Sequence, residues 1–200
     1  MREDENTLSQ ATDFIAYVDQ LKGVIRQNGL FDDSRSENTA EHSWHAALSA
    51  IVLSPYANEP VDIDRVTRML LIHDLIEIEA GDTFVYDGEG LAAQETAELK
   101  AAEIVFGRLP QPLGRELRTL WDEFEARQTA DAKFAKAVDR FMPLFSNIRN
   151  GGSSWLPHGI TKAQVIEICH IIQDGSETLW ALSEDMLDDA EARGWLRTDQ

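Results

Sequence analysis

Apolar residues recur three or four positions apart along almost the whole chain, and no convincing stretch alternates apolar and polar residues. Phe14, Tyr17, Val18 and Leu21 illustrate the pattern, because this spacing places all four on one side of a helix. We therefore predict an all-α fold, a bundle of amphipathic helices. The predicted helices cover residues 14–24, 40–53, 62–81, 91–109, 113–126, 130–147 and 162–195.

Several predicted helix ends carry side chains or glycines that commonly cap helices. Asn38 precedes the second helix and Glu41 follows three residues later, as in a capping box. Asp62 or Asp64 can cap the third helix, and Gly81 can end it. The Gly/Ser-rich loop NGGSSWLPHG is followed directly by more helical pattern. We therefore expect one domain over residues 1–200.

Charge and cysteine content restrict the partners and the setting. The chain has 200 residues and a formal net charge of −18, which argues against nucleic-acid polymers and anionic membranes as partners. No apolar run approaches the ~20 residues of a membrane span. Cys169 is the only cysteine, and the acidic N-terminus is unlike a signal peptide, so we expect a cytoplasmic protein. A small phosphorylated substrate remains compatible, because a metal ion and arginines reverse a local field.

The segment LLIHDLIEIEAGD at residues 70–82 combines an apolar helix pattern with charged side chains. His73 and Asp74 stand in its middle, and Glu77 follows one turn later. A buried ionised carboxylate is costly unless it is paired, hydrogen-bonded or bound to a metal. The segment therefore carries either a structural polar network or a cation.

Two further residues favour the cation. His42 lies early in the second predicted helix, and Asp139 lies in KFAKAVDRFMPLF, beside Ala135 and Met142 on its helix face. Taken singly, each residue is more often a structural hydrogen-bonding group or a solvated side chain. Taken together, three helices each offer a metal-competent residue where an unpaired one would be expensive, which points to a divalent metal site.

Three ordered motifs resemble those of a known family. ENTAEHSWHA, LLIHDLIEIEAGD and AKAVDRF look like the metal motifs of the HD-domain phosphohydrolases, in particular the single-domain branch of 5'-deoxynucleotidases and related 5'-nucleotidases. The resemblance extends to LKGVIR upstream and GGSSWLPHGITKAQVI downstream, and covers about residues 15–180. It implies an HD-type helical bundle.

The resemblance also implies a cofactor and its ligands. One divalent cation (Mn, Co, Fe, Ni, Zn or Mg) would be bound by four residues. These are His42, His73, Asp74 and Asp139.

The same resemblance assigns three further roles. Glu77 matches the acidic residue that assists the attacking water, and Arg26 matches an arginine that orients the substrate phosphate. Asp82 matches an acidic residue near the sugar and the catalytic water. The implied activity is hydrolysis of a phosphomonoester, most simply a nucleoside 5'-monophosphate, by direct attack of water, and a homodimer is implied as the assembly.

The chain departs from the deoxynucleotidase branch in two places. That branch has a tryptophan directly after the arginine, used for sugar discrimination, whereas Gln27 stands here. It also has a Pro-Thr turn after Gly-Asp, whereas this chain continues as GDTFVYD. The preference between ribose and deoxyribose is therefore open, and similar treatment of both is our expectation.

Two other functions are weighed against hydrolysis. A mixed-valent di-iron oxygenase of the HD fold needs additional histidines between the His-Asp pair and the last aspartate, and none occurs between His73 and His158. A non-catalytic, metal-stabilised helical module that binds nucleotides or a protein is the second alternative. Glu77 and Arg26 argue against it, because a scaffold needs no general base.

A few residues near the motifs have open roles. His45 could face the same way as His42 or lie at the surface, and Arg35 could add positive charge to the site or be a surface residue. The tryptophans are expected to pack in the core. They include Trp44, Trp121, Trp155 and Trp180.

Overall fold

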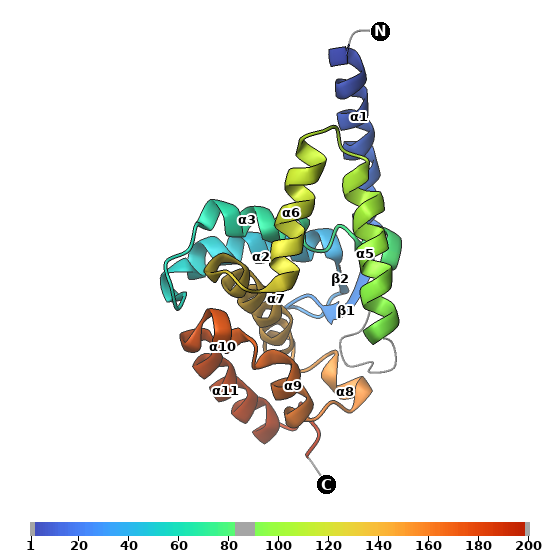
Figure 1. Ribbon diagram of the computed structural model, residues 1–200. Helices are drawn as coiled ribbons and strands as arrows, with labels where there is room; N and C mark the ends of the chain where they lie inside the picture. Colours follow the sequence, from blue (N-terminus) through green and yellow to red (C-terminus); the bar gives the residue numbers. More distant parts are fainter. Residues whose placement is uncertain (1–2, 83–90, 199–200) are drawn as a thin grey trace.

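Helix α7 runs through the middle of the molecule in the computed structural model, which describes residues 3–82 and 91–198 (Figure 1). It contacts α2, α3, α6, α10 and α11. Residues 134–139 are all buried, as expected for a helix surrounded on every side. The helices are α1 (Glu3–Val18), α2 (Thr39–Leu53), α3 (Ile63–Ile72), α4 (Glu77–Ala80), α5 (Leu91–Gly107), α6 (Leu113–Ala126), α7 (Ala130–Arg149), α8 (Trp155–His158), α9 (Lys162–Cys169), α10 (Ile172–Gly175) and α11 (Glu177–Ala192), with 3₁₀ turns η1 (Asp19–Gly23) and η2 (Ser54–Tyr56).

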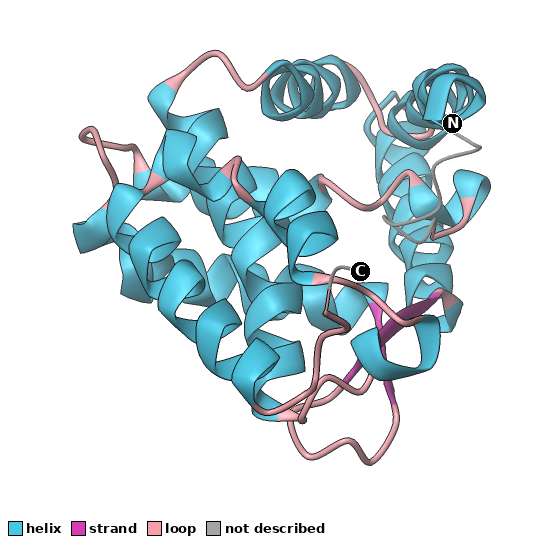
Figure 2. Ribbon diagram, turned by 90° about the horizontal axis from the view of Figure 1, so that it is seen from below, coloured by secondary structure: helices cyan, strands magenta, loops and turns pink. Residues whose placement is uncertain are grey.

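The all-α prediction is confirmed, with one small addition. Strands β1 (Ile25–Gly29) and β2 (Ser36–Asn38) pair antiparallel, Ile25 opposite Asn38 (Figure 2). The sequence IRQNG of β1 has a single large apolar residue, so alternation could not reveal it. The hydroxyl of Ser146 on α7 donates to the carbonyl of Gly29 at 2.6 Å, which holds the hairpin against the central helix.

The N-terminal helix begins earlier than predicted. We expected residues 14–24, whereas α1 already starts at Glu3 and continues into η1. Its first half buries little, and Leu8 is 65% exposed, so this part carries no apolar periodicity that could mark it. In Figure 1 this half of α1 extends beyond the rest of the molecule.

The predicted helix at 62–81 is interrupted where the functional motif lies. Asp62 caps α3, as one of the two proposed caps, and Gly81 ends α4 at φ 78°. Between them, residues 73–76 form turns in which N–H groups bond three residues back, such as Glu77 N to Asp74 O at 3.0 Å. With three residues per turn, positions i and i+3 are eclipsed, so Asp74 and Glu77 lie side by side.

The predicted helix at 162–195 is likewise divided, into α9, α10 and α11. Gly175 explains one break: a Cβ there would lie 2.3 Å from the carbonyl oxygen of Lys133 on α7, so only glycine permits this close approach. Ser176 then adopts an extended conformation and caps α11 by accepting from Leu179 N.

Other expectations for the helices are confirmed. Asn38 and Glu41 form the predicted capping box at the start of α2. Cys169 is buried, and burial raises the pKa of its thiol to about 12, so that the thiol is inert near neutral pH. Among the described residues, none of the helices has the length and apolar character that crossing a membrane requires.

Candidate active site

Three helices bring buried metal-ligating side chains to one point. His42 lies in the first turns of α2, His73 directly follows α3, and Asp139 lies in the middle of α7. All three are buried, and one ligand atom of each lies within 4.8 Å of the others. His42 and Asp139, which are 97 positions apart in the sequence, are thus in contact, as expected from the motifs.

Asp74 adds the fourth predicted side chain. Its Oδ2 lies 3.1 Å from Nε2 of His73 and 4.0 Å from Nε2 of His42. Oδ1 of Asp139 lies 3.1 Å from Nε2 of His42 and 3.2 Å from Nε2 of His73. Donor atoms on one octahedral cation, with bonds of about 2.1 Å, lie about 3.0 Å apart when adjacent and about 4.2 Å apart when opposite. His42, His73 and Asp139 therefore fit a divalent metal, and Asp74 lies against the two histidines of this group.

The charges in this cluster also suit a cation. Burial by itself raises the pKa of Asp139, but Lys136 and His73 hold it well below its usual range. Burial opposes ionisation of Asp74 as well, and there His73 and Arg26 keep its pKa low. Both carboxylates are therefore ionised, which is the state that binds a metal ion.

The environment of His73 fixes the direction of its ring. Its Nδ1–H donates to the carbonyl of Leu70 at 2.8 Å, which leaves Nε2 directed at the two carboxylates. Trp121 donates its indole N–H to the carbonyl of His73 at 3.0 Å, and the ring of Phe124 packs against the imidazole with centroids 5.1 Å apart. Burial lowers the pKa of His73, but Asp74 and Asp139 outweigh it and raise that pKa to about 10.

Glu77 lies beside the cluster and carries a perturbed carboxyl group. Burial and the charge of Asp74 raise its pKa to about 9, while Arg26 opposes the shift. The hydroxyl of Thr39 donates to Oε2 of Glu77 at 2.8 Å and so holds the carboxyl in place. Glu77 can therefore hold or exchange a proton near neutral pH, which is the property of a general acid or base.

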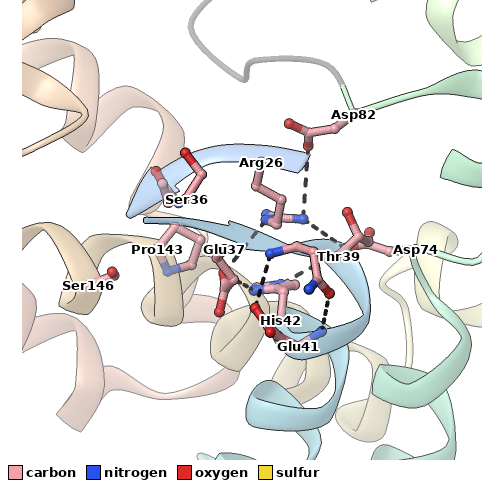
Figure 3. A network of polar contacts seen from close by, with 12 residues as sticks. Arg26, Ser36, Glu37, Thr39, Glu41, His42, Asp74, Asp82, Pro143 and Ser146 are labelled. Carbon is pink, nitrogen blue, oxygen red and sulfur yellow. Dashed lines mark hydrogen bonds and ion pairs between the residues drawn. The ribbon is translucent and has the colours of Figure 1, made fainter. Parts of the chain in front are cut away.

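Arg26 projects from β1 into the middle of the acidic groups (Figure 3). Its Nη1 donates to Oδ2 of Asp74 at 2.9 Å. The same nitrogen lies 3.9 Å from Oε1 of Glu77 and 3.9 Å from Oδ1 of Asp82. Although burial disfavours its charge, these three carboxylates raise the pKa of Arg26 above its ordinary value. Arg26 is thus a permanent cation at the edge of the metal site.

Asp82 also reaches this edge, 3.9 Å from Nη1 of Arg26. Burial and the charge of Asp74 raise the pKa of its carboxyl group, and Arg26 lowers it. The net shift of this pKa is upward. The part of GDTFVYD that follows Asp82, at residues 83–87, lies outside the described residues, and the departure from the Pro-Thr turn is not addressed by the structure.

Sequence reasoning missed three residues that contact this cluster. Lys136 is buried one helical turn before Asp139, and its Nζ lies 3.3 Å from Oδ2 of that ligand. The spacing of three residues on a buried helix could have revealed it. Thr39 and Glu37 precede His42 outside or at the very start of α2, where no helical spacing indicates them.

Two residues with open roles lie away from the cluster. The ring of His45 packs against Phe31, with centroids 5.5 Å apart, and stacks on Trp44. Arg35 donates two hydrogen bonds to Glu41 at the surface. Trp121, Trp155 and Trp180 are buried as expected, but Trp44 is 60% exposed, because it lies on the outer face of α2.

Comparison with known proteins gives consistent similarities. The HD domain family matches residues 18–180. The human 5'-deoxynucleotidase HDDC2 is 31% identical over 128 residues, which is 64% of this chain and 61% of that protein. A 5'-deoxynucleotidase of Yersinia pestis is 25% identical over 153 residues, covering 72% of this chain and 77% of its own. The chain therefore spans a little under two thirds of the length of its human relative.

Solved structures extend the similarity over the whole chain. The crystal structure of a predicted metal-dependent phosphohydrolase from Magnetospirillum magnetotacticum MS-1 is 46% identical, with a TM-score of 0.93, over 98% of this chain and 99% of that one. The PH0347 protein of Pyrococcus horikoshii is 19% identical with a TM-score of 0.61 over 91% of this chain and 99% of its own, which shows a shared fold.

Proposed function

The chain belongs to the HD domain family, and we propose that it is a metal-dependent phosphohydrolase that releases phosphate from nucleoside 5'-monophosphates. The observation that carries this proposal is Arg26, whose Nη1 lies 2.9 Å from Asp74 at the edge of the buried histidine–aspartate cluster. A guanidinium beside metal ligands suits a phosphate monoester, because both groups neutralise phosphoryl oxygens. The names of the relatives support nucleotides as the substrate class.

Four side chains would hold the divalent cation. When bound, such a cation lowers the pKa of a coordinated water and polarises a phosphoryl oxygen. Two imidazoles and two carboxylates suit Mn, Co, Fe, Ni or Zn, whereas Mg prefers oxygen ligands. The proposed ligands are His42, His73, Asp74 and Asp139.

Glu77 is the proposed proton carrier. Its carboxyl lies beside Asp74, and a pKa raised to about 9 keeps a proton exchangeable close to neutral pH. In its protonated form it can donate a proton to the 5'-oxygen that leaves, and in its ionised form it can accept one from the attacking water. Thr39 supports either role, since its hydrogen bond of 2.8 Å fixes the position of the carboxyl.

Arg26 is the proposed phosphate-binding residue. Its planar guanidinium is charged at every relevant pH and can donate to oxygens of the monoester while negative charge grows in the transition state. Asp82 lies 3.9 Å from Arg26 Nη1 and is proposed to contact the sugar. No covalent intermediate is required, because water can attack the phosphorus directly.

A phosphate-release screen tests this function. Purified protein is assayed with nucleoside 5'-monophosphates, 3'-monophosphates, triphosphates, a phosphodiester and sugar phosphates, each with Mn, Co, Fe, Ni, Zn or Mg. We expect metal-dependent release from 5'-monophosphates that is lost with chelator and in Asp139→Ala. If metal-loaded protein releases no phosphate from any compound, the hydrolase assignment is wrong and the non-catalytic module replaces it.

We also propose that the protein forms a homodimer through the outer face of α2. Trp44, Leu48, Ile51 and Val52 are between 45% and 66% exposed there. No Asp, Glu, Lys or Arg occurs from residue 42 to residue 58, in a chain with a net charge of −18. Two such acidic chains repel each other less where the contact face is uncharged, and a symmetric contact must be self-complementary.

The mass in solution tests the assembly. Light scattering on the protein eluted from a size-exclusion column is expected to give twice the chain mass. The variant Val52→Asp is expected to give the monomer mass, with the helical content measured by circular dichroism unchanged. Lys162→Ala on α9, remote from this face, serves as the control. A monomeric parent protein at micromolar concentration contradicts the proposal.

A further inference from the structure

Glu37 is a largely buried carboxylate with no place in the roles assigned so far. It lies on β2 and directly precedes Asn38, whose side chain caps α2. Its side chain is only 14% exposed. A carboxylate with so little access to water needs charged or hydrogen-bonding partners.

Both of its charged partners belong to the candidate active site. Oε2 of Glu37 lies 3.5 Å from Nδ1 of His42 and 3.9 Å from Nε of Arg26. Figure 3 shows the carboxylate between the imidazole and the guanidinium. One oxygen thus faces a proposed metal ligand and the proposed phosphate-binding residue together.

The contact with His42 matters for how the ring is presented. A histidine binds a metal through one neutral ring nitrogen, so the proton must lie on the other nitrogen and needs an acceptor there. His73 satisfies this condition with the Leu70 carbonyl, 2.8 Å from its Nδ1. For His42, whose Nε2 lies 3.1 Å from Asp139, Glu37 is the oxygen-bearing group that faces Nδ1.

The contact with Arg26 concerns the other end of the site. Nε of Arg26 is buried without a hydrogen-bond partner among the described residues, whereas its Nη1 donates to Asp74. Glu37 supplies a negative charge on the Nε side of the guanidinium plane. With Asp74 at one edge and Glu37 at another, the orientation of the donor fork is set before a phosphate arrives.

We propose that Glu37 is a positioning residue whose negative charge faces Nδ1 of His42 and the Nε edge of Arg26, and thereby aligns the proposed metal ligand and the proposed phosphate-binding residue. The inference rests on the proposed function and adds to it a carboxylate outside the ligand set. Loss of such an outer partner of a metal-binding histidine typically lowers metal affinity or activity about 10–100-fold.

Two substitutions separate positioning from simple space filling. Glu37→Gln keeps the size and an acceptor oxygen but removes the charge, and Glu37→Ala removes both. We expect metal affinity, measured by competition with a chelator, to fall in the order parent, Gln, Ala, by about 10-fold or more in the last. The visible absorption spectrum of the Co²⁺-loaded protein should change in both variants, and KM for the nucleoside monophosphate should rise at saturating metal.

Glu41 provides matched controls four residues away. Its carboxylate pairs with Arg35 and accepts from the backbone N–H of Asn38, so Glu41→Gln and Glu41→Ala alter the same helix start outside the site. These variants are expected to keep the parent metal affinity and Co²⁺ spectrum, even where the melting temperature falls.

The outcomes distinguish this inference from the proposed function. If Glu37→Gln binds metal as the parent does, with the same Co²⁺ spectrum and the same KM, Glu37 only fills space and the inference is wrong. If the parent itself binds no divalent metal, the proposed function fails first. A parent that binds metal and hydrolyses substrate, with Glu37 variants affected and Glu41 variants unaffected, supports both.

Discussion

Arg26 Nη1 donates a hydrogen bond of 2.9 Å to Oδ2 of Asp74, the same oxygen that lies 3.1 Å from Nε2 of His73. The residue proposed to bind phosphate is therefore in direct contact with a proposed metal ligand. Cation and phosphate would occupy adjoining positions, separated by one carboxylate. This contact joins the proposed metal site and the proposed phosphate site into a single charge network.

Replacing Arg26 tests that network. Arg26→Met leaves Asp74, Glu77 and Asp82 without their cation, and breaking a buried ion pair typically costs about 3–5 kcal/mol. We expect the metal-free variant to melt below the parent and to regain much of the loss with Mn²⁺ or Co²⁺. Its kcat/KM should fall by about 100-fold or more, because phosphate charge is no longer neutralised.

Arg193→Met is the matched control, because Arg193 pairs with Asp189 at the surface. It should behave as the parent in both measurements. An Arg26 variant that turns over nucleoside monophosphates at the parent rate would exclude a phosphate-binding role.

Metal binding should stabilise the fold, because the proposed ligands come from three helices. A ligand that binds only the native state adds about 2.7 kcal/mol at a concentration one hundred times its dissociation constant. Thermal melts with and without Mn²⁺ or Co²⁺ measure the effect. Asp139→Ala should remove most of it, whereas Asp189→Asn on the exposed face of α11 should leave it unchanged. No shift in the parent would mean that the cluster binds no metal.

The proposed metal-binding residues could be singled out from the sequence because burying each of these polar side chains costs free energy. His42, His73 and Asp139 lie in segments whose sequence pattern is helical, and all three are buried, where a polar side chain needs a partner. Glu37 gave no such signal, because it lies in a strand of three residues between a surface turn and a helix cap. Its proximity to His42 depends on tertiary structure, and no spacing rule expresses it.

The backbone of the site was harder to predict than its side chains. The apolar pattern of a helix continues through residues 73–76. Only the backbone hydrogen bonds differ there, because N–H groups bond to the carbonyl three residues back instead of four. Over four residues, an α-helical turn and a 3₁₀ turn place apolar side chains at similar spacings, so the sequence does not distinguish them. His45 illustrates the same limit: three positions after His42, it is rotated enough to pack against Phe31 instead of entering the cluster.

Ribose and deoxyribose substrates should be hydrolysed similarly. Gln27 stands where the 5'-deoxynucleotidase branch has a sugar-discriminating tryptophan. It is exposed on β1, and because neighbouring side chains of a strand alternate between faces, it points away from Arg26. We expect kcat/KM for AMP and dAMP to agree within about 10-fold, which corresponds to about 1.4 kcal/mol in transition-state binding. Gln27→Ala should leave the ratio of the two kcat/KM values unchanged. A strong preference for the deoxynucleotide would show that other residues read the 2'-position.

The stability of the metal-free protein should depend on pH through Glu77. Its pKa is raised from 4.5 to about 9, so between these values the native state holds a proton that the unfolded state releases. The free energy of unfolding must then fall as pH rises through this window, by at most about 1.4 kcal/mol per pH unit. Glu77→Gln removes this contribution, so its stability relative to the parent should increase from pH 5 to pH 9.

Denaturant melts in the presence of chelator at pH 5, 7 and 9 give the required differences. Glu79→Gln, on the same short helix but bonded to the hydroxyl of Tyr17, is the comparison variant. A constant difference between Glu77→Gln and the parent at all three pH values would contradict the raised pKa.

Glu77 also allows catalysis to be separated from metal binding. Glu77→Gln preserves the size of the side chain and an oxygen that can accept from Thr39, but it cannot exchange a proton. We expect the metal content to equal that of the parent and the turnover to be lower by about 100-fold or more, since general acid–base catalysis contributes about 10²–10⁴-fold. Asp139→Ala should lose metal and turnover together, and Glu79→Gln should lose neither. If Glu77→Gln loses its metal, Glu77 is a ligand; if it turns over at the parent rate, the proton is carried by another group.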